Sequence, residues 1–468
     1  MFDVSALELF VSPIQRLMMH NGVDDVNIYI KREDLLPFSF GGNKVRIAKE
    51  YFDDLNSQGK NCMIGYGNIR SNLCRTLANI CKAHDTECHI ISPLDDAQEC
   101  QTTANSRLVC LCDAVIHTCT KDKVSQTIQS VLKDCESKRL KPYYINGNIY
   151  GIGNEAVPVR AYEKVYREIK QQAESLNMKF DYIFLATGTG ATQSGLIAGK
   201  NLSNGSENIV GISISRSTSV CTSVIEKHLN AFSKQNPSCV VSEKDIIVCD
   251  DYLCDGYGKY NDAIIQLILK MYRETGIALD PVYSGKGFYG MLEYVKKTGI
   301  KNKNILFVHT GGTPLFFDFI NKHISADSVK FCNDSQKLTA FLERIDCVLP
   351  VPLSARVSIP EYVKKTLDYG KVICIEENDE IVSAALFYCN DYTNHQAYLT
   401  LIATVPIKQK TGHAGRLLNM AEKIARESKM TSFHLDTEIC NSKAISFYLK
   451  NNYKITYVAD KIHMEKEL

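Results

Sequence analysis

The sequence predicts an α/β protein: a doubly wound parallel-sheet region followed by a smaller mixed α/β domain. Apolar runs alternate with helix-period segments from about residue 61 to residue 310, the pattern of parallel strands covered by helices on both faces. A length of 468 residues allows two or three domains. A short polar stretch at 323–337 precedes a different order of elements, which indicates a linker.

Seven strands and seven helices are expected in the first region. Ligands of such folds bind at the carboxyl ends of the strands, so residues that follow the strands are the first candidates for a site. The predicted strands are 62–65, 88–92, 114–117, 182–186, 209–214, 246–249 and 305–308, and the predicted helices are 45–55, 71–83, 124–135, 155–174, 191–200, 218–232 and 261–275.

The region after the linker has a hairpin pattern around Asn378-Asp379, and then strands mixed with helices. We place the domains at 1–325 and 337–468, joined by a linker at 326–336. The expected elements are strands 371–376, 380–388 and 398–405, helix 411–427, strand 432–438, helix 441–451 and a closing strand 454–459.

Composition excludes several classes of function. A net charge of +1 gives no electrostatic case for nucleic acid or an anionic membrane. No apolar stretch approaches the length of a membrane span, and the first residues lack the pattern of a secretory signal, so we expect a cytoplasmic protein. The 18 cysteines are then reduced thiols. Cys110 and Cys112 have the wrong spacing for a zinc knuckle, and we expect no metal site.

Lys44 ends the run Phe40-Gly41-Gly42-Asn43-Lys44 and begins an amphipathic segment. Two glycines let the backbone pass close to a ligand, and the helix start that follows brings positive potential to the same place. Such an environment favours the neutral amine, which can condense with an aldehyde cofactor. The alternative is a solvated lysine in an ordinary turn.

Two further glycine-rich turns follow predicted strands. Gly188-Thr189-Gly190-Ala191-Thr192 follows strand 182–186, and its N–H groups and hydroxyls can hold a phosphate at the start of a helix. His309-Thr310-Gly311-Gly312-Thr313 follows strand 305–308. One such turn alone is weak evidence, but a lysine loop together with a phosphate loop is much stronger.

Residues 10–320 resemble the fold-type II pyridoxal phosphate enzymes, which have a tryptophan synthase β-like fold with two subdomains. Within them the chain is similar to the branch of 1-aminocyclopropane-1-carboxylate deaminase and D-cysteine desulfhydrase. The matching segments occur in the family's order and are Ile30–Leu35 with Phe40–Arg46, Ser71-Asn72, Gly188–Thr192, Leu279–Tyr283 and His309–Gly312.

The resemblance implies roles for these residues. Lys44 would carry pyridoxal phosphate and move protons, Ser71 and Asn72 would bind the substrate carboxylate, and Ser71, Tyr257 and Tyr283 would be catalytic. Ser284 stands where the deaminases carry an acid near the pyridine nitrogen. A hydroxyl cannot hold that nitrogen protonated, which favours β-elimination, β-replacement or racemisation over ring opening. The implied cofactor-binding residues are Asn43, Asn72, Gly188, Thr189, Gly190, Ala191, Thr192, Ser284 and Thr310.

The chain also departs from this family. Arg70 and Leu73 flank Ser71-Asn72 where Gln and His are usual, and the loop at 146–151 is atypical. Arg70 is either a clamp for an anion or a surface arginine. Together these changes suggest a substrate that differs from those of both named activities.

Residues 337–468 resemble the GNAT acetyltransferases, which implies acetyl-CoA as a second cofactor. Gln409, Gly412, Ala414 and Gly415 open a helix whose free N–H groups suit a pyrophosphate. By the resemblance, backbone at 403–405, including Val405, would hold the pantetheine, and Asn441 would contact the cofactor. Tyr448 would protonate the leaving thiolate; the alternative is that it packs the helix on the sheet. Glu438 and His434 are candidates for the general base.

The resulting hypothesis is a cytoplasmic bifunctional enzyme. It would combine a pyridoxal phosphate reaction on a small amino acid (racemisation, β-replacement or β-elimination) with N-acetylation of the substrate or product. One alternative is desulfhydrase-type elimination beside an independent acetyltransferase, and another is a degenerate, non-catalytic sensor or scaffold. The first resemblance also suggests a homodimer.

Overall fold

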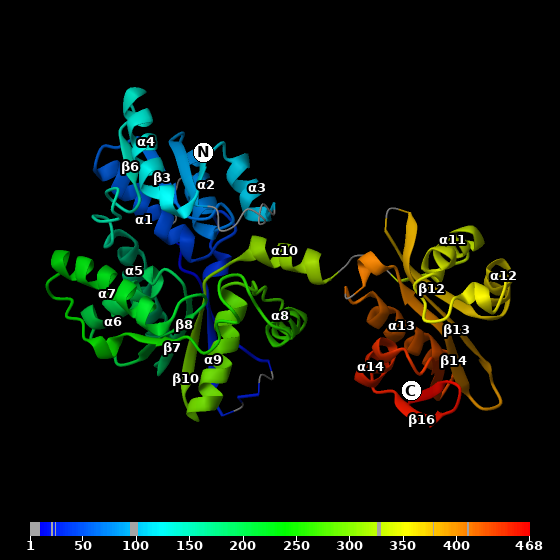
Figure 1. Cartoon of the computed structure of the whole chain (residues 1–468). Coiled ribbons are helices and arrows are strands. Elements are labelled where there is room, and N and C mark those ends of the chain that lie inside the picture. The colour runs from blue at the N-terminus through cyan, green and yellow to red at the C-terminus, as the bar shows by residue number, and fades with distance from the viewer. Residues whose placement is uncertain are drawn as a thin grey trace. The chain divides into compact units, whose positions relative to one another are not determined.

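The computed structural model describes residues 10–19, 22–23, 25–93, 102–324, 329–377, 379–409 and 411–468. The chain divides into two compact units, Met1–Ile320 and Asn321–Leu468 (Figure 1). A two-residue strand at Lys330–Phe331 lies inside the range predicted as a linker, and residues 325–328 lie outside the described residues. The domain boundaries at 325 and 337 therefore stay a prediction. Asn378 of the predicted hairpin turn is also outside the described residues.

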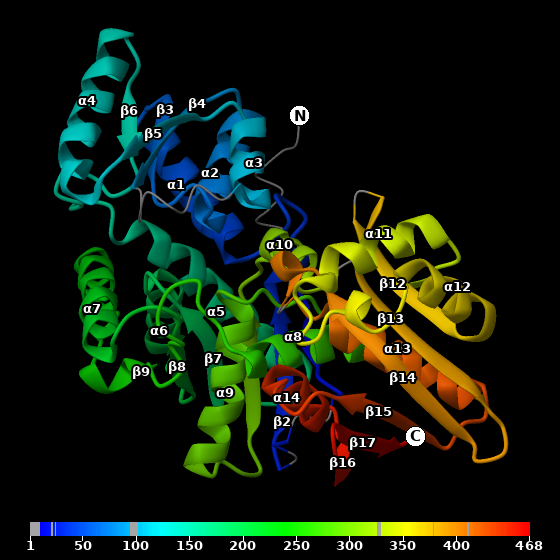
Figure 2. The ribbon, with the colours of Figure 1, turned by 45° about the vertical axis from the view of Figure 1, so that its right-hand side comes forward.

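The first unit contains a four-stranded parallel sheet in the order β5-β4-β3-β6. Nearly all residues of β3 and β4 are buried, as expected for a parallel sheet covered on both faces. Figure 2 shows α4 running along this sheet. The elements are β3 Cys62–Tyr66, β4 Glu87–Pro93, β5 Val115–Cys119, β6 Pro142–Tyr144, α1 Asn43–Ser57, α2 Asn72–Ala83, α3 Ala104–Leu111 and α4 Val124–Ser137.

The same unit contains a six-stranded sheet in the order β1-β2-β10-β7-β8-β9. β1 is antiparallel to β2, and the other neighbours are parallel. The elements are β1 Ile14–Arg16, β2 Asn27–Arg32, β7 Tyr182–Thr187, β8 Asn208–Ser213, β9 Ile247–Cys249, β10 Asn304–His309, α5 Val157–Ser175, α6 Ala191–Leu202, α7 Thr218–Gln235, α8 Asp262–Thr275, α9 Ser284–Thr298 and α10 Thr313–His323.

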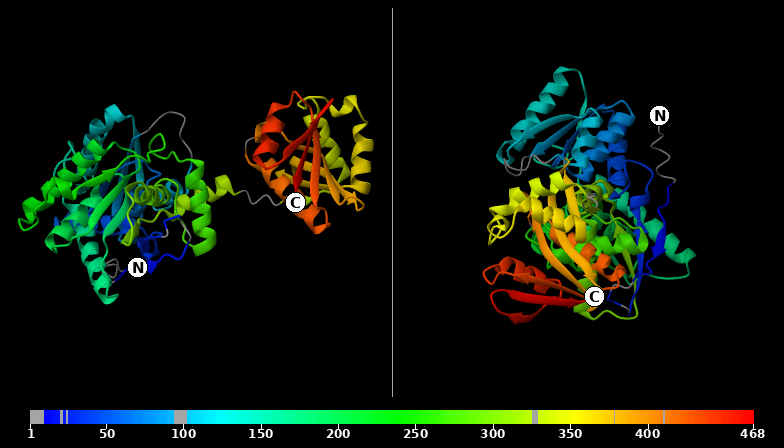
Figure 3. Two further views of the ribbon diagram at one scale, coloured as in Figure 1. Left: turned by 90° about the horizontal axis from the view of Figure 1, so that it is seen from below. Right: turned by 90° about the vertical axis from the view of Figure 1, so that its right-hand side faces the viewer.

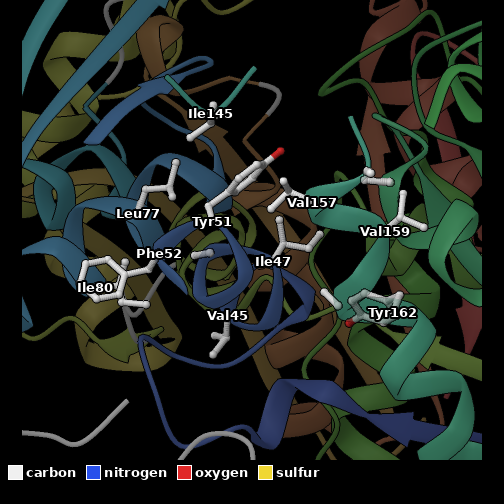
Figure 4. Close-up of a cluster of buried hydrophobic side chains, with 14 of the residues drawn as sticks. Val45, Ile47, Tyr51, Phe52, Leu77, Ile80, Ile145, Val157, Val159 and Tyr162 are labelled. Atoms are coloured by element: carbon white, nitrogen blue, oxygen red, sulfur yellow. The ribbon is translucent and has the colours of Figure 1, made fainter. Parts of the chain in front are cut away.

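Helix α1 is packed between α2 and α5, and this packing positions the helix start that carries Lys44. Figure 4 shows α1 side chains between those of the two neighbouring helices. Burying each large apolar side chain contributes about 1.5–3 kcal/mol. The side chains are Val45, Ile47, Tyr51 and Phe52 of α1, Leu77 and Ile80 of α2, and Val157, Val159 and Tyr162 of α5.

A buried charged group also fixes the start of α1. Glu33 is fully buried and accepts hydrogen bonds from Arg46 Nε (2.8 Å), Tyr162 OH (2.8 Å) and Ser12 Oγ (2.6 Å). Burial alone would raise the pKa of Glu33, but the Arg46 guanidinium lowers it below its usual value, so the carboxylate stays charged. The Glu33 carbonyl accepts the Gly42 N–H at 2.8 Å, which anchors the loop before Lys44.

The second unit is a seven-stranded sheet in the order β11-β12-β13-β14-β15-β17-β16. All neighbours are antiparallel except β14 and β15. Central residues of β12 and β13 are buried on both faces, and Figure 3 shows helices on both sides of the sheet. The elements are β11 Lys330–Phe331, α11 Ser335–Asp346, α12 Ile359–Tyr369, β12 Lys371–Glu377, β13 Glu380–Asp391, β14 Gln396–Thr404, α13 His413–Glu427, β15 Ser432–Thr437, α14 Ser442–Lys450, β16 Lys454–Val458 and β17 Ile462–Glu467.

Strand 454–459 was predicted to be the last strand of the second unit, and this prediction was wrong. Strand 454–459 corresponds to β16, but β17 follows it and inserts between β15 and β16. Strands β1, β2 and β6 were not predicted. Among the described residues, no helix is long and apolar enough to span a membrane. The cytoplasmic location and the homodimer stay predictions.

Candidate functional sites

A cavity of about 330 Å³ lies in the first unit, at the carboxyl ends of strands from both sheets. It is lined by residues that directly follow β3, β7, β8 and β10. Eleven of the predicted site residues line it together, although they come from distant parts of the sequence. They are Asn43, Lys44, Ser71, Asn72, Gly188, Thr189, Gly190, Thr192, Tyr257, Tyr283 and Thr310.

Lys44 is the second residue of α1, and its loop is pressed against the loop after β10. The Asn43 N–H donates to the Thr310 carbonyl at 3.1 Å. Gly42 (φ 97°) and Gly311 (φ 88°) are so close that a Cβ on Gly311 would lie 2.5 Å from Gly42 Cα. Only glycines permit this contact. Burial lowers the pKa of Lys44 from 10.5 to about 8, so neutral amine is available near neutral pH.

The loop after β7 turns sharply into α6. Gly190 has φ 76° and is the N-cap of α6, and among the described residues no side chain caps this helix start. Its first N–H groups are therefore available to an anion at the edge of the cavity. Asn43 Nδ2 donates to Thr192 Oγ1 at 2.9 Å, which joins the lysine loop to this loop.

Ser71 is the N-cap of α2, and its Oγ accepts the Cys74 N–H at 3.2 Å. Ser71 lines the cavity, and its hydroxyl can still act as a hydrogen-bond donor. The Asn72 side chain is buried, and its Oδ1 accepts a hydrogen bond from Asn105 Nδ2 at 3.0 Å. This contact sets which end of the amide faces the cavity. Asn105 was not predicted as a site residue, because it lies in a different helix, α3.

The two tyrosines meet at the cavity. The hydroxyl oxygens of Tyr257 and Tyr283 are 2.7 Å apart, and the rings are arranged edge to face. Burial raises the pKa of both phenols, so each stays protonated at neutral pH and can donate a proton.

The lining carries positive charge. Among the described residues that line the cavity, the charged side chains are Lys44 and Arg216, with no carboxylate beside them. Such a cavity favours an anionic ligand. Arg216 was missed by the sequence reasoning, as were Tyr66 and Asn68. The available signal was their position, because Tyr66 ends β3 and Asn68 and Arg216 follow β3 and β8.

In the second unit, β14 and β15 separate along their length. Their parallel pairing runs from Gln396–Ser432 to Leu399–Leu435 and stops there, while β14 continues to Thr404. The last part of β14 therefore offers backbone groups that β15 does not pair. Helix α13 begins beyond this opening with the N-cap Gly412 (φ 89°), and among the described residues no side chain caps it.

Comparisons with known proteins match a family to each of the two units. The family described as "Pyridoxal-phosphate dependent enzyme" matches residues 8–311. The chain belongs to this family. The family described as "Acetyltransferase (GNAT) family" matches residues 349–453 within the second unit. The predicted fold class, a two-subdomain fold-type II pyridoxal phosphate enzyme with a C-terminal GNAT domain, is confirmed.

Individual relatives resemble the pyridoxal phosphate domain. D-cysteine desulfhydrase of Serratia proteamaculans (strain 568) is 28% identical over 313 residues, which cover 66% of this chain and 93% of the relative. The crystal structure of an ACC deaminase homologue has a TM-score of 0.57 and 25% identity, covering 68% of this chain and 97% of that one. Cysteine synthase from Entamoeba histolytica shares the fold, with a TM-score of 0.50, 15% identity and coverage of 70% and 92%.

The residues of the pyridoxal phosphate domain fit that cofactor. A lysine of depressed pKa and an uncapped helix start line one cavity, as an aldehyde and a phosphate on one molecule require. Two predicted cofactor residues do not line the cavity. Ala191 is the buried first residue of α6. Ser284 is fully buried, and its Oγ donates to Asp280 Oδ2 at 2.7 Å. Their cofactor roles stay predictions.

Arg70 was expected to be either an anion clamp or a surface arginine. It does not line the cavity, and its Nε donates to Asn68 Oδ1 at 3.2 Å. Arg216 is therefore the better candidate for an anion clamp.

The GNAT domain also fits its expected cofactor. A Cβ on Gly412 or on Gly415 would have no atom within 4 Å, so a pyrophosphate can approach this helix start closely. Gln409 Nε2 donates to the Thr404 carbonyl at 3.4 Å, and Val405 follows the open end of β14. Ala414 is the second residue of α13, and Asn441 is the N-cap of α14.

The surroundings of Tyr448 and Glu438 set the protonation states of these two side chains. Tyr448 is buried between Phe447 and Tyr453, and burial raises its pKa, so the phenol stays protonated. The hydrogen bond and charge of Arg356 lower the pKa of Glu438, which makes it a poor base. Asp436 and His463 form another candidate base, because Asp436 Oδ1 lies 2.7 Å from His463 Nδ1. This pair was not predicted from the sequence, since His463 lies on β17, which was not predicted.

Proposed function

We propose that the first domain transforms a small amino acid with pyridoxal phosphate and that the second acetylates the amine of its substrate or product. The observation that carries the first half is Lys44, an amine of low pKa in a cavity beside Ser71 and two protonated tyrosines. The proposed reaction is racemisation, β-replacement or β-elimination, because Ser284 stands where ring opening would call for an acid.

When bound, pyridoxal phosphate supplies an electron sink that makes the α proton of an amino acid acidic. Lys44 Nζ then takes and returns this proton, since its amine can be neutral near pH 8. The N–H groups at the start of α6 hold the phosphate. Ser71 Oγ–H and the Asn72 amide orient the substrate carboxylate, and the guanidinium of Arg216 binds a negative charge on the substrate.

Tyr257 and Tyr283 supply a second proton donor. Their hydroxyls are joined by a hydrogen bond of 2.7 Å, so one phenol can donate outward while its partner stabilises the oxygen left behind. A donor of this kind protonates a leaving group at the β carbon or returns a proton to the α carbon.

In the second domain the start of α13 holds the pyrophosphate of acetyl-CoA, and the open end of β14 holds its pantetheine. Asp436 is charged, because hydrogen bonds from Tyr398 (2.7 Å) and His463 outweigh burial and lower its pKa. We assign the Asp436–His463 pair as the base that takes a proton from the amine. Tyr448 protonates the departing thiolate.

A product that keeps its amine suits the second domain. Elimination gives a keto acid and ammonia, and leaves no amino-acid amine to acetylate. Racemisation and β-replacement leave the amine in place. The test is incubation of the full chain with candidate amino acids and both cofactors, read by mass spectrometry. An N-acetylated amino acid supports the proposal, and one of altered chirality or β substituent supports racemisation or β-replacement. Stoichiometric keto acid with no N-acetylated amino acid contradicts the proposal.

Similarity to the D-cysteine desulfhydrase of Serratia proteamaculans supports a second candidate, elimination from a D-amino acid. The acetyltransferase would then consume the same amino acid independently. This candidate predicts keto acid and sulfide from D-cysteine without acetyl-CoA. Addition of acetyl-CoA would lower the yield of keto acid by diverting substrate. Failure to release keto acid would exclude it.

A further inference from the structure

Two thiols and an imidazole converge inside the four-stranded sheet subdomain, away from the cofactor cavity. Cys62, His89 and Cys135 are all buried, and one ligand atom of each lies within 4.8 Å of the others. The two Sγ atoms are 3.8 Å apart, and Cys135 Sγ is 3.6 Å from His89 Nε2.

These distances match those between ligands of a tetrahedral zinc ion. Zinc binds sulfur at about 2.3 Å and nitrogen at about 2.0–2.1 Å. A tetrahedral angle then separates two sulfurs by about 3.8 Å and a sulfur from a nitrogen by about 3.5 Å. Both separations agree with these values.

Glu87 is the candidate for a fourth ligand, because its side chain lies beside His89. Its Oε1 lies 3.0 Å from His89 Nε2. In the parallel register Cys62 is paired with Glu87 and Ile64 with His89, so the side chains of Cys62, Glu87 and His89 share one face of the sheet. Helix α4 covers that face and adds Cys135. The Glu87 side chain is 39% exposed, which provides an entry path from solvent.

His117 orients the imidazole. Its Nε2 lies 2.9 Å from Nδ1 of His89, and the two rings are stacked. A metal on Nε2 requires the proton of His89 on Nδ1, where His117 accepts it. Such an outer contact is usual for a metal-bound histidine and fixes both its tautomer and its ring orientation.

We propose that Cys62, His89, Cys135 and Glu87 bind one zinc ion. Cys62 and Glu87 are the first residues of β3 and β4, so the site lies at the amino edge of the sheet, opposite the carboxyl edge that forms the cofactor cavity. The ion is structural and ties β3, β4 and α4 together. No metal site was predicted from the sequence. Cys62 and Cys135 are 73 residues apart in the sequence, and only the fold brings them together.

The test uses the full chain purified under a phosphine reductant. Mass spectrometry of the metals should find about one zinc per chain. After chelation, one equivalent of Co²⁺ should produce a thiolate-to-cobalt charge-transfer band, and Cys62→Ser and Cys135→Ser should each abolish it. The matched control is Cys239→Ser, which removes a buried thiol from the other sheet's subdomain and should leave the band unchanged.

Two milder variants keep the test valid if a buried substitution prevents folding. His117→Gln should weaken zinc binding about 10–100-fold, the usual cost of losing such an outer contact. Glu87→Gln, at an exposed side chain, should weaken binding and shift the cobalt spectrum. A wild-type protein without zinc and without the cobalt band would overturn the proposal. So would a cobalt band that persists in Cys135→Ser.

Discussion

The Asn43 amide donates a 2.9 Å hydrogen bond to the hydroxyl of Thr192, across 149 residues of sequence. It joins the loop of the lysine to the loop expected to hold the phosphate. The distance between the two attachment points of the cofactor is thereby set before the cofactor binds. Pre-organisation of this kind raises affinity because little order has to be gained on binding.

Asn43→Ala should therefore weaken binding of pyridoxal phosphate. Loss of a buried hydrogen bond that leaves a partner unsatisfied costs about 1–3 kcal/mol, or about 5- to 150-fold in affinity. Titration of cofactor-free protein, followed by visible absorbance, measures this. Asn201→Ala is the control, because the side-chain amide of Asn201 also donates a hydrogen bond, to the Val240 carbonyl at 2.8 Å, but at the far end of α6. Equal affinities of wild type and Asn43→Ala would contradict the prediction.

Uptake of the cofactor should depend on pH through Lys44. Its folded-state pKa of about 8 lies below the ordinary 10.5, so the reactive neutral amine accumulates as pH rises through 8. The rate of uptake should increase from pH 7 to about pH 9 and then level off. Lys44→Ala should abolish the lysine-bound absorbance band, whereas Lys49→Ala on the same helix should retain it. A rate that is constant from pH 7 to 9 would refute the assignment.

Arg216 and Arg70 can be distinguished by steady-state kinetics. Arg216→Gln should raise KM for the amino acid by about 10- to 100-fold with little change in kcat, because hydrogen bonds to charged groups contribute about 1.5–3 kcal/mol. Arg70→Gln should change KM by less than about threefold, since Arg70 lies outside the lining. The reverse order would show that Arg70 is the clamp.

Glu33→Gln should destabilise the first domain by about 3–5 kcal/mol, because it leaves Arg46 partly buried without its main partner. The effect should depend on pH. The folded pKa of Glu33 is depressed, so its contribution is present above the unfolded value near 4.5 and is lost as pH falls through the folded pKa. Urea unfolding at pH 7 and at pH 3 measures both.

Lys82→Ala removes an exposed ion pair with Asp113 and serves as the comparison for Glu33→Gln, and we expect its loss of stability to be much smaller because solvent screens the pair. Similar losses in the two variants would contradict the importance of the buried carboxylate.

His463→Gln should reduce acetyl transfer by about 10²–10⁴-fold and flatten its rise with pH, as removal of a general base does. Glu438→Gln should have a much smaller effect, since Arg356 already holds that carboxylate as an ion. Thiol release from acetyl-CoA measures both variants. Loss of activity in Glu438→Gln alone would reverse the assignment.

Much of the fold could be predicted because its strands are buried and apolar. β7 and β10 are continuous runs of buried side chains, and both were predicted within one residue at each end. β17, Ile462–Glu467, was missed because its apolar pattern is weak. Only Ile462 and Met464 are buried, and the residues between and after them are polar. β2 was missed for a related reason, since Lys31 and Arg32 interrupt its apolar pattern.

Part of the cavity could be predicted because a reactive side chain stands next to a recognisable backbone turn, as Lys44 does after its two glycines. Arg216 carries no such signature, and its place in the lining depends on β8 lying next to β7 in the sheet. The Asp436–His463 pair likewise requires the register of β15 with β17. Such relationships are long-range in sequence, and local patterns do not contain them.

The contact between Gly42 and Gly311 has a consequence for synthesis of the chain. The lysine leaves the ribosome early, but the loop that completes its surroundings is made some 267 residues later, after β10. A growing chain can therefore capture its cofactor only when nearly the whole first unit has emerged. A chain that ends anywhere between residues 45 and 311 contains Lys44, but it should remain colourless.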